Sequence, residues 1–134
     1  MPVVDASVCV ALFKADEPGH EASRTWLGAA TESREPVVAP VTLLPEVAAA
    51  LGRGAGDEEL ALRVVALLRS TRLVQLFPVT EGLAERAARI AAGQRIRGGD
   101  ALYVALAAEL RMELVTLDRQ QFERGAEVIA TRRL

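Results

Sequence analysis

Residues 2–14, with the sequence PVVDASVCVALFK, are the part of the chain that most clearly indicates its fold. A short apolar run typical of a buried strand comes first, and the apolar spacing becomes helical directly after Asp5. A second apolar strand, at residues 113–117, is followed by Asp118. Because open parallel α/β sheets build their sites at the carboxyl ends of strands, the two aspartates predict one shared acidic crevice.

Strand patterns and helix patterns alternate along the rest of the chain. Further strands are expected at residues 36–40, 73–79 and, at a sheet edge, 127–131. Helices are expected at residues 6–14, 20–30, 43–53, 57–72, 80–92 and 100–111, with a short helix or turn at 119–124. The alternation predicts an α/β fold, with a mainly parallel sheet of four to five strands covered on both faces.

The bulk composition describes one globular domain over residues 1–134, since a chain of 134 residues can bury one core but not two. A net charge of −2 argues against a generally basic nucleic-acid binder, so any nucleic-acid partner must bind to a local patch. Fifteen of the sixteen basic residues are arginines, which leaves guanidinium groups available for phosphate.

The single cysteine, Cys9, excludes an intrachain disulfide and a cysteine-based metal site, which is typical of a reducing compartment. No run of about 18 apolar residues is present, and the amino terminus enters a strand without a signal-peptide pattern. We therefore expect a soluble, cytoplasmic protein with no membrane segment.

Four acids stand at the ends of expected elements. Asp5 and Asp118 follow strands, Asp100 opens the helix at 100–111, and Glu46 lies near the start of the helix at 43–53. Right-handed crossovers would bring these acids to one end of the sheet. Clustered carboxylates stay ionised at neutral pH only if a cation or helix amino termini neutralise them.

An all-oxygen set of this kind suits Mg²⁺ or Mn²⁺ rather than Zn²⁺, which prefers histidine and cysteine. With such an ion, water becomes a nucleophile that can hydrolyse a nucleic-acid backbone. Each acid alone has a simpler interpretation as a helix cap, a helix-dipole partner or a turn residue, and it is their combination that favours a metal site. Which acid serves as general base stays open.

The ordered motifs resemble the PIN-domain family. They are VVDAS at residues 3–7, Glu46 before an Ala-rich helix, GDAL at 99–102 and LVTLD at 114–118. Residues 16–21, DEPGHE, are similar to a segment common in the VapC toxins of bacterial toxin–antitoxin pairs. The resemblance spans nearly the whole chain and implies a three-layer α/β/α sandwich. It also implies a metal-dependent endoribonuclease in which Asp5, Glu46, Asp100 and Asp118 hold Mg²⁺ or Mn²⁺ and activate water.

The same resemblance implies an RNA substrate, a homodimer and a VapB-type antitoxin that blocks the active-site groove. Ser7 and Thr116 match the family's hydroxyl positions beside the first and last acids, where they can orient carboxylates or a metal-bound water. Arg119 stands where some relatives carry a fifth acid, so that carboxylate is missing here and tight binding of a second ion is disfavoured.

Arg95 and Arg97 lie just before Asp100 and are candidate contacts for RNA phosphate, with an ordinary solvated loop as the alternative.

Two other functions stay open from sequence. One is an aspartyl-phosphate phosphotransfer enzyme with Asp5 as nucleophile, although Ser7 stands where a haloacid-dehalogenase-like site has a second aspartate and Lys14 is the only lysine. The other is a noncatalytic PIN-like binding module whose acids only cap helices. A serine triad is rejected, because Ser7 lacks the Gly-x-Ser-x-Gly setting and His20 is the only candidate base.

Overall fold

A five-stranded parallel sheet forms the centre of the protein in a computed structural model, which describes residues 1–134 apart from the side chain of residue 55. The strands are β1 (Val3–Val4), β2 (Val37–Pro40), β3 (Val74–Phe77), β4 (Leu114–Thr116) and β5 (Thr131–Arg133). Their order is β3-β2-β1-β4-β5, and every neighbouring pair is parallel. The predicted sheet is confirmed.

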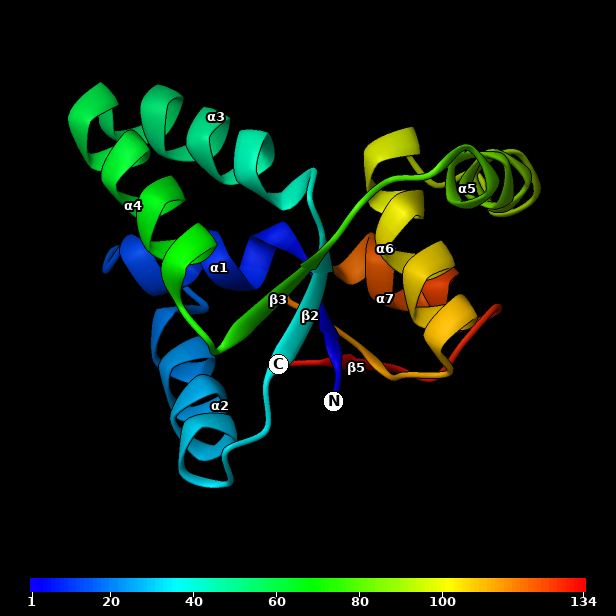
Figure 1. The fold of residues 1–134 in the computed structure, drawn as a ribbon, viewed down its shortest axis with the longest axis horizontal. Coiled ribbons are helices and arrows are strands. Elements are labelled where there is room, and N and C mark those ends of the chain that lie inside the picture. The colour runs from blue at the N-terminus through cyan, green and yellow to red at the C-terminus, as the bar shows by residue number, and fades with distance from the viewer.

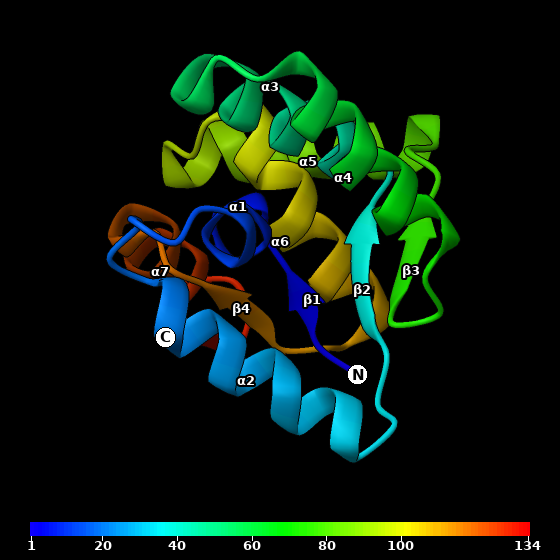
Figure 2. The same cartoon turned by 90° about the vertical axis from the view of Figure 1, so that its left-hand side faces the viewer.

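Helices cover both faces of this sheet (Figures 1 and 2). One face carries α1 (Ala6–Phe13), α2 (His20–Glu32), α3 (Leu43–Ala55) and α4 (Glu58–Ser70). The other carries α5 (Glu81–Gln94), α6 (Gly98–Leu110) and α7 (Arg119–Gly125). The result is the expected three-layer α/β/α sandwich. None of the helices in the described part of the chain is long and apolar enough to span a membrane.

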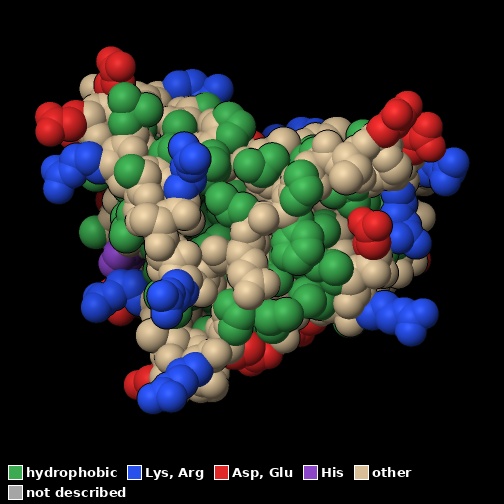
Figure 3. Space-filling model, in the orientation of Figure 1, with side chains coloured by type: hydrophobic (Ala, Val, Ile, Leu, Met, Phe, Trp, Pro, Cys, Tyr) green, Lys and Arg blue, Asp and Glu red, His purple; other side chains and the backbone are tan. Residues whose placement is uncertain are grey.

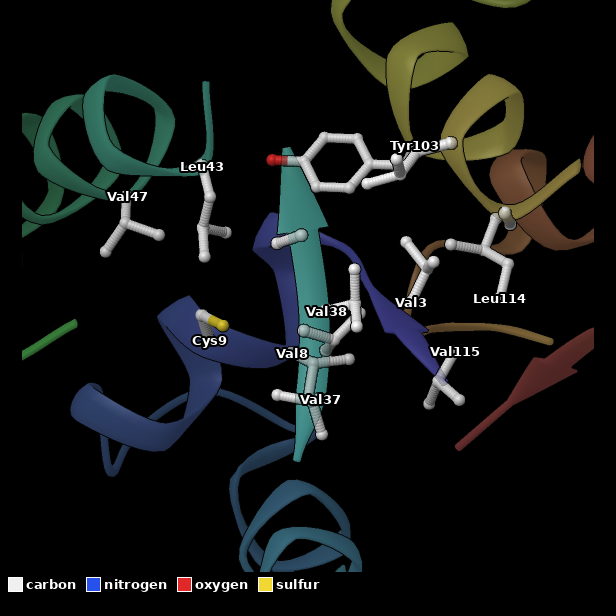
Figure 4. Close-up of a cluster of buried hydrophobic side chains, with 14 of the residues drawn as sticks. Val3, Val8, Cys9, Val37, Val38, Leu43, Val47, Tyr103, Leu114 and Val115 are labelled. Carbon is white, nitrogen blue, oxygen red and sulfur yellow. The ribbon is translucent and has the colours of Figure 1, made fainter. Parts of the chain in front are cut away.

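The central strands are apolar on both sides because helices bury both of their faces. Val3, Val38 and Leu114 are fully buried and lie in register across β2, β1 and β4 (Figure 4). Sheet order reverses at β1, since β2 and β3 lie to one side of it and β4 and β5 to the other. This is the topological switch point at which α/β sheets open a crevice, and it brings the carboxyl ends of β1 and β4 together.

Several element boundaries differ from the sequence predictions, and three of the differences have a clear structural reason. The last strand is residues 131–133 and not 127–131, because the amides of Val128 and Ile129 still donate to the Gly125 carbonyl in the turn after α7. Helix α3 continues through two glycines and ends only where Gly56 adopts a left-handed φ of 63°. Helix α6 begins at Gly98, so Asp100 lies in its first turn and is not its N-cap.

Candidate active site

One cavity of about 790 Å³ lies at the carboxyl ends of the central strands, and all four predicted acids line it. Asp5 follows β1, Asp118 lies just beyond β4, Glu46 comes from the first turn of α3 and Asp100 from the first turn of α6. In Figure 3 the surface has a notch between the part formed by α3 and α4 and the part formed by α5 and α6. The first turns of α3 and α6 lie on its two sides (Figure 1).

Asp5 is the most enclosed of the four acids, with 4% of its surface exposed. Burial raises its pKa from 3.8 to about 6; hydrogen bonds from Ser7 and Thr116 work in the opposite direction, and the charge of Asp100 adds a smaller increase. Its side chain also accepts the Ser7 amide at 3.0 Å, as the N-cap of α1. Asp5 therefore caps a helix, and it also presents a carboxylate whose negative charge is poorly compensated.

The two predicted hydroxyls hold both oxygens of Asp5. Ser7 Oγ donates to Oδ1 and Thr116 Oγ1 donates to Oδ2. Each hydroxyl also accepts a backbone amide of the loop after β4, from Leu117 at 3.0 Å and from Asp118 at 2.9 Å. These bonds fix the Asp5 carboxylate relative to the Asp118 backbone, which is the orienting geometry expected of support residues.

Asp118 caps α7 by accepting the Gln121 amide at 2.8 Å. The buried Gln121 side chain then donates to the Asp100 carbonyl at 2.9 Å, and so ties α7 to the start of α6. Sequence reasoning missed this residue. The Asp-x-x-Gln spacing is a capping-box pattern and could have marked Gln121 as part of the helix start, although not its contact with Asp100.

Arg97 lies between two of the acids. Its Nε donates to Asp100 Oδ2 at 2.9 Å, and its Nη2 is 3.9 Å from Asp118 Oδ2. Its side chain is 73% exposed, so it can also reach a phosphate outside the cavity. Arg95, the other predicted phosphate contact, is not among the residues that line the cavity, and its carbonyl accepts a bond from Arg124.

Arg133 is a second basic residue in the cavity lining, and its Nε donates to the Leu117 carbonyl at 3.3 Å. Arg133 was not among the predicted site residues, because the last strand was expected at residues 127–131. A strand at residues 131–133 pairs with β4 and carries Arg133 to the mouth of the site.

Glu46 is half-buried, and its Oε2 accepts a hydrogen bond from the hydroxyl of Tyr103 on α6. Burial raises the pKa of Glu46, while the Tyr103 bond and the charge of Arg97 lower it. Burial, followed by the bond to Glu46, raises the pKa of Tyr103, so this phenol stays protonated at neutral pH and donates the hydrogen bond to Glu46. Tyr103 was not among the residues predicted for the site. It is a core residue, but its hydroxyl faces the site.

The donor set fits a hard divalent ion that keeps part of its hydration shell. Four carboxylates share one cavity, and Mg²⁺ is commonly bound by one or two carboxylates plus water. Leaving aside the side chain of residue 55, no three histidine, cysteine, aspartate or glutamate side chains are placed to hold one ion together. An ion bound here would keep water in part of its coordination shell, and the role of the four acids as metal ligands stays a prediction.

The comparisons with known proteins agree with this architecture. The PIN domain model matches residues 3–128, and the chain therefore belongs to the PIN domain family. Among curated proteins, no sequence relative was found.

Three solved structures share the fold. The crystal structure of Mycobacterium tuberculosis VapC20, a toxin that cleaves the sarcin-ricin loop, has a TM-score of 0.80 at 22% identity, with both chains fully covered. VapBC2 from Rickettsia felis, bound to a DNA fragment of its promoter, has a TM-score of 0.73 at 12% identity over 98% of this chain and 97% of that one. A toxin–antitoxin complex from Klebsiella pneumoniae has a TM-score of 0.64 at 17% identity over 91% and 90%.

Proposed function

We propose that the protein is a Mg²⁺- or Mn²⁺-dependent endoribonuclease of the VapC type. The observation that carries this proposal is the meeting of Asp5, Glu46, Asp100 and Asp118 in one cavity at the switch point of a PIN-domain sheet. Negative charge gathered from four separate elements is costly for folding alone, and a bound divalent cation would offset that cost.

In this proposal all four acids serve the metal, some as direct ligands and the others through its bound water, and one of them accepts the proton from water. A bound Mg²⁺ or Mn²⁺ would activate water and stabilise the charge that develops on the phosphodiester. Ser7 and Thr116 keep the Asp5 carboxylate in one orientation by donating to its two oxygens.

Phosphate recognition falls to basic side chains at the cavity. Arg97 lines the site with a largely exposed guanidinium, and Arg133 lines it from β5. On the face drawn in Figure 3, the lysine and arginine side chains are scattered and form no continuous basic patch. The net charge of −2 favours binding of RNA through a few contacts close to the acids.

We extend the proposal to the partners. Two of the structures that share the fold are toxin–antitoxin complexes, which supports a VapB-type antitoxin as the inhibitor of this chain. We further propose that it acts in the cytoplasm as a homodimer. Size-exclusion chromatography with light scattering, on the chain alone and with the product of a neighbouring small gene, tests both assemblies.

The decisive assay is RNA cleavage by the purified chain with Mn²⁺, with Mg²⁺ and with EDTA. Wild type should cleave only with metal, and Asp100→Asn should stay folded but lose cleavage, because the change removes one ligand charge while keeping the side-chain shape. Glu59→Gln, an exposed acid on α4 outside the cavity, is the matched control and should cleave like wild type.

Two results would replace this proposal. A folded wild-type protein that neither binds Mn²⁺ nor cleaves RNA would indicate a noncatalytic PIN-like binding module. Phosphorylation of Asp5 by a small phosphodonor, without RNA cleavage, would indicate a phosphotransfer enzyme.

A further inference from the structure

The tyrosine ring of α6 reaches across the end of the sheet to a helix on its other side. Figure 4 shows the Tyr103 ring beyond the carboxyl end of β2, with its hydroxyl directed toward α3. The side chain is 1% exposed, and its hydroxyl donates to Glu46 Oε2. Tyr103 is the only tyrosine in the chain, and the bond joins residues that are 57 positions apart.

The other oxygen of the same carboxylate lies against a glycine. A Cβ built on Gly99 would be 2.7 Å from Glu46 Oε1, closer than real side chains approach. Gly99 and Tyr103 are four residues apart in α6 and so lie on one face of that helix. One helix face thus borders both carboxylate oxygens of Glu46, with the Tyr103 hydroxyl at one and a glycine that has no side chain at the other.

We propose that Tyr103 is a positioning residue that fixes the Glu46 carboxylate toward the metal, and that Gly99 is required to leave room for it. This inference rests on the proposed function of the site. Glu46 has a long side chain on a first helical turn, and without the Tyr103 bond it would occupy several rotamers. Binding an ion would then restrict it to one rotamer, at a cost in conformational entropy. Asp5 has a comparable arrangement, because Ser7 and Thr116 hold both of its oxygens.

The alternative is purely structural: the bond would satisfy a buried phenol and do nothing for Glu46. The two interpretations predict different measurements. A structural bond contributes to the stability of the metal-free protein, whereas a positioning bond contributes to metal affinity only when the Glu46 carboxylate is present.

The experiment is a double-mutant cycle on Mn²⁺ binding to the metal-free protein, measured by titration calorimetry and by the electron paramagnetic resonance of free Mn²⁺. Tyr103→Phe should weaken Mn²⁺ binding about 10- to 100-fold, the usual effect of removing a group that orients a metal ligand. In a Glu46→Gln background the same change should have no further effect on affinity. Urea unfolding of each metal-free variant gives stability separately.

A pair of neighbouring glycines supplies a second, independent test. Gly99→Ala should weaken Mn²⁺ binding by displacing the Glu46 carboxylate. Gly98→Ala should leave binding unchanged, because a Cβ at that position has nothing within 4 Å. The two changes carry a similar gain in helix propensity, so the contrast between them isolates contact with Glu46.

The outcomes separate this inference from the proposed function. If Glu46→Gln binds Mn²⁺ as wild type does, the metal role of Glu46 itself is wrong. If Glu46→Gln weakens binding while Tyr103→Phe and Gly99→Ala do not, the site stands and the positioning role is overturned. Lowered stability of Tyr103→Phe with unchanged Mn²⁺ affinity likewise overturns it in favour of the structural bond.

Discussion

Replacing Asp5 by asparagine should make the metal-free protein more stable at neutral pH, although the change alters a buried, fully hydrogen-bonded residue. Burial raises the pKa of Asp5 from 3.8 to about 6. Between these two values the folded protein binds more protons than the unfolded chain, so the free energy of unfolding falls as pH rises. Above about pH 6 Asp5 is ionised in the folded protein, and the full loss of folding stability caused by its buried charge is present.

The size of the cost follows from the two pKa values. They differ by about two pH units, each worth about 1.4 kcal/mol, so ionised Asp5 costs the folded state about 3 kcal/mol at pH 7.5. Asparagine removes the charge and remains an equally good N-cap. In the wild type two hydroxyls donate to the Asp5 carboxylate, and an asparagine amide can accept from only one of them. Losing about one hydrogen bond reduces the stability gained by removing the charge by about 1 to 1.5 kcal/mol.

The net expectation is a gain of about 1 to 2 kcal/mol, or roughly 4 to 8 °C in melting temperature for a chain of this length. The gain should shrink by about 2 kcal/mol at pH 4.5, where Asp5 of the folded wild type is protonated. Urea unfolding in EDTA at pH 7.5 and 4.5, followed by circular dichroism and by the fluorescence of the single tryptophan, Trp26, measures both differences.

Comparing variant with wild type at each pH cancels the contributions of other titrating groups. A loss of stability in Asp5→Asn at pH 7.5 would refute the reasoning and leave Asp5 as a structural cap. An identical difference at the two pH values would refute it as well, because the burial cost must depend on ionisation.

Two further predictions concern the surroundings of the acids. Arg97→Gln should bind Mn²⁺ more tightly, because a competing cation is removed. It should bind RNA more weakly, with a dependence of log affinity on log salt concentration that is lower by about one, whereas Arg95→Gln should change neither property. Unchanged RNA binding by Arg97→Gln would show that Arg97 does not contact phosphate. Thr116→Val removes a hydrogen bond that lowers the pKa of Asp5, so the rise of Mn²⁺ affinity with pH, measured from pH 5.5 to 8, should occur at a higher pH than in wild type. An unshifted pH profile would contradict this role of Thr116.

The sheet and the acid positions could be predicted because both follow from local sequence. Strands buried on two faces are short and apolar throughout, and the change to helical spacing after Asp5 marks where β1 ends. Asp5 and Asp118 follow such strands, and their convergence is a consequence of parallel order with a switch point at β1.

The contacts between the acids could not be predicted in the same way. Tyr103 meets Glu46 only because its ring spans the end of β2 between α6 and α3, and no local pattern encodes that distance. The position of β5 depends on its pairing with β4, so the residues that form this strand could not be predicted from the local sequence alone. Arg133 was missed as a consequence.

The most direct test of the central claim is a crystal structure of the protein grown with Mn²⁺, analysed by anomalous scattering. We expect a manganese peak inside the cavity, coordinated by oxygens of at least two of Asp5, Glu46, Asp100 and Asp118. A protein that cleaves RNA with Mn²⁺ but shows no peak in this cavity, or binds the ion elsewhere on its surface, would contradict it.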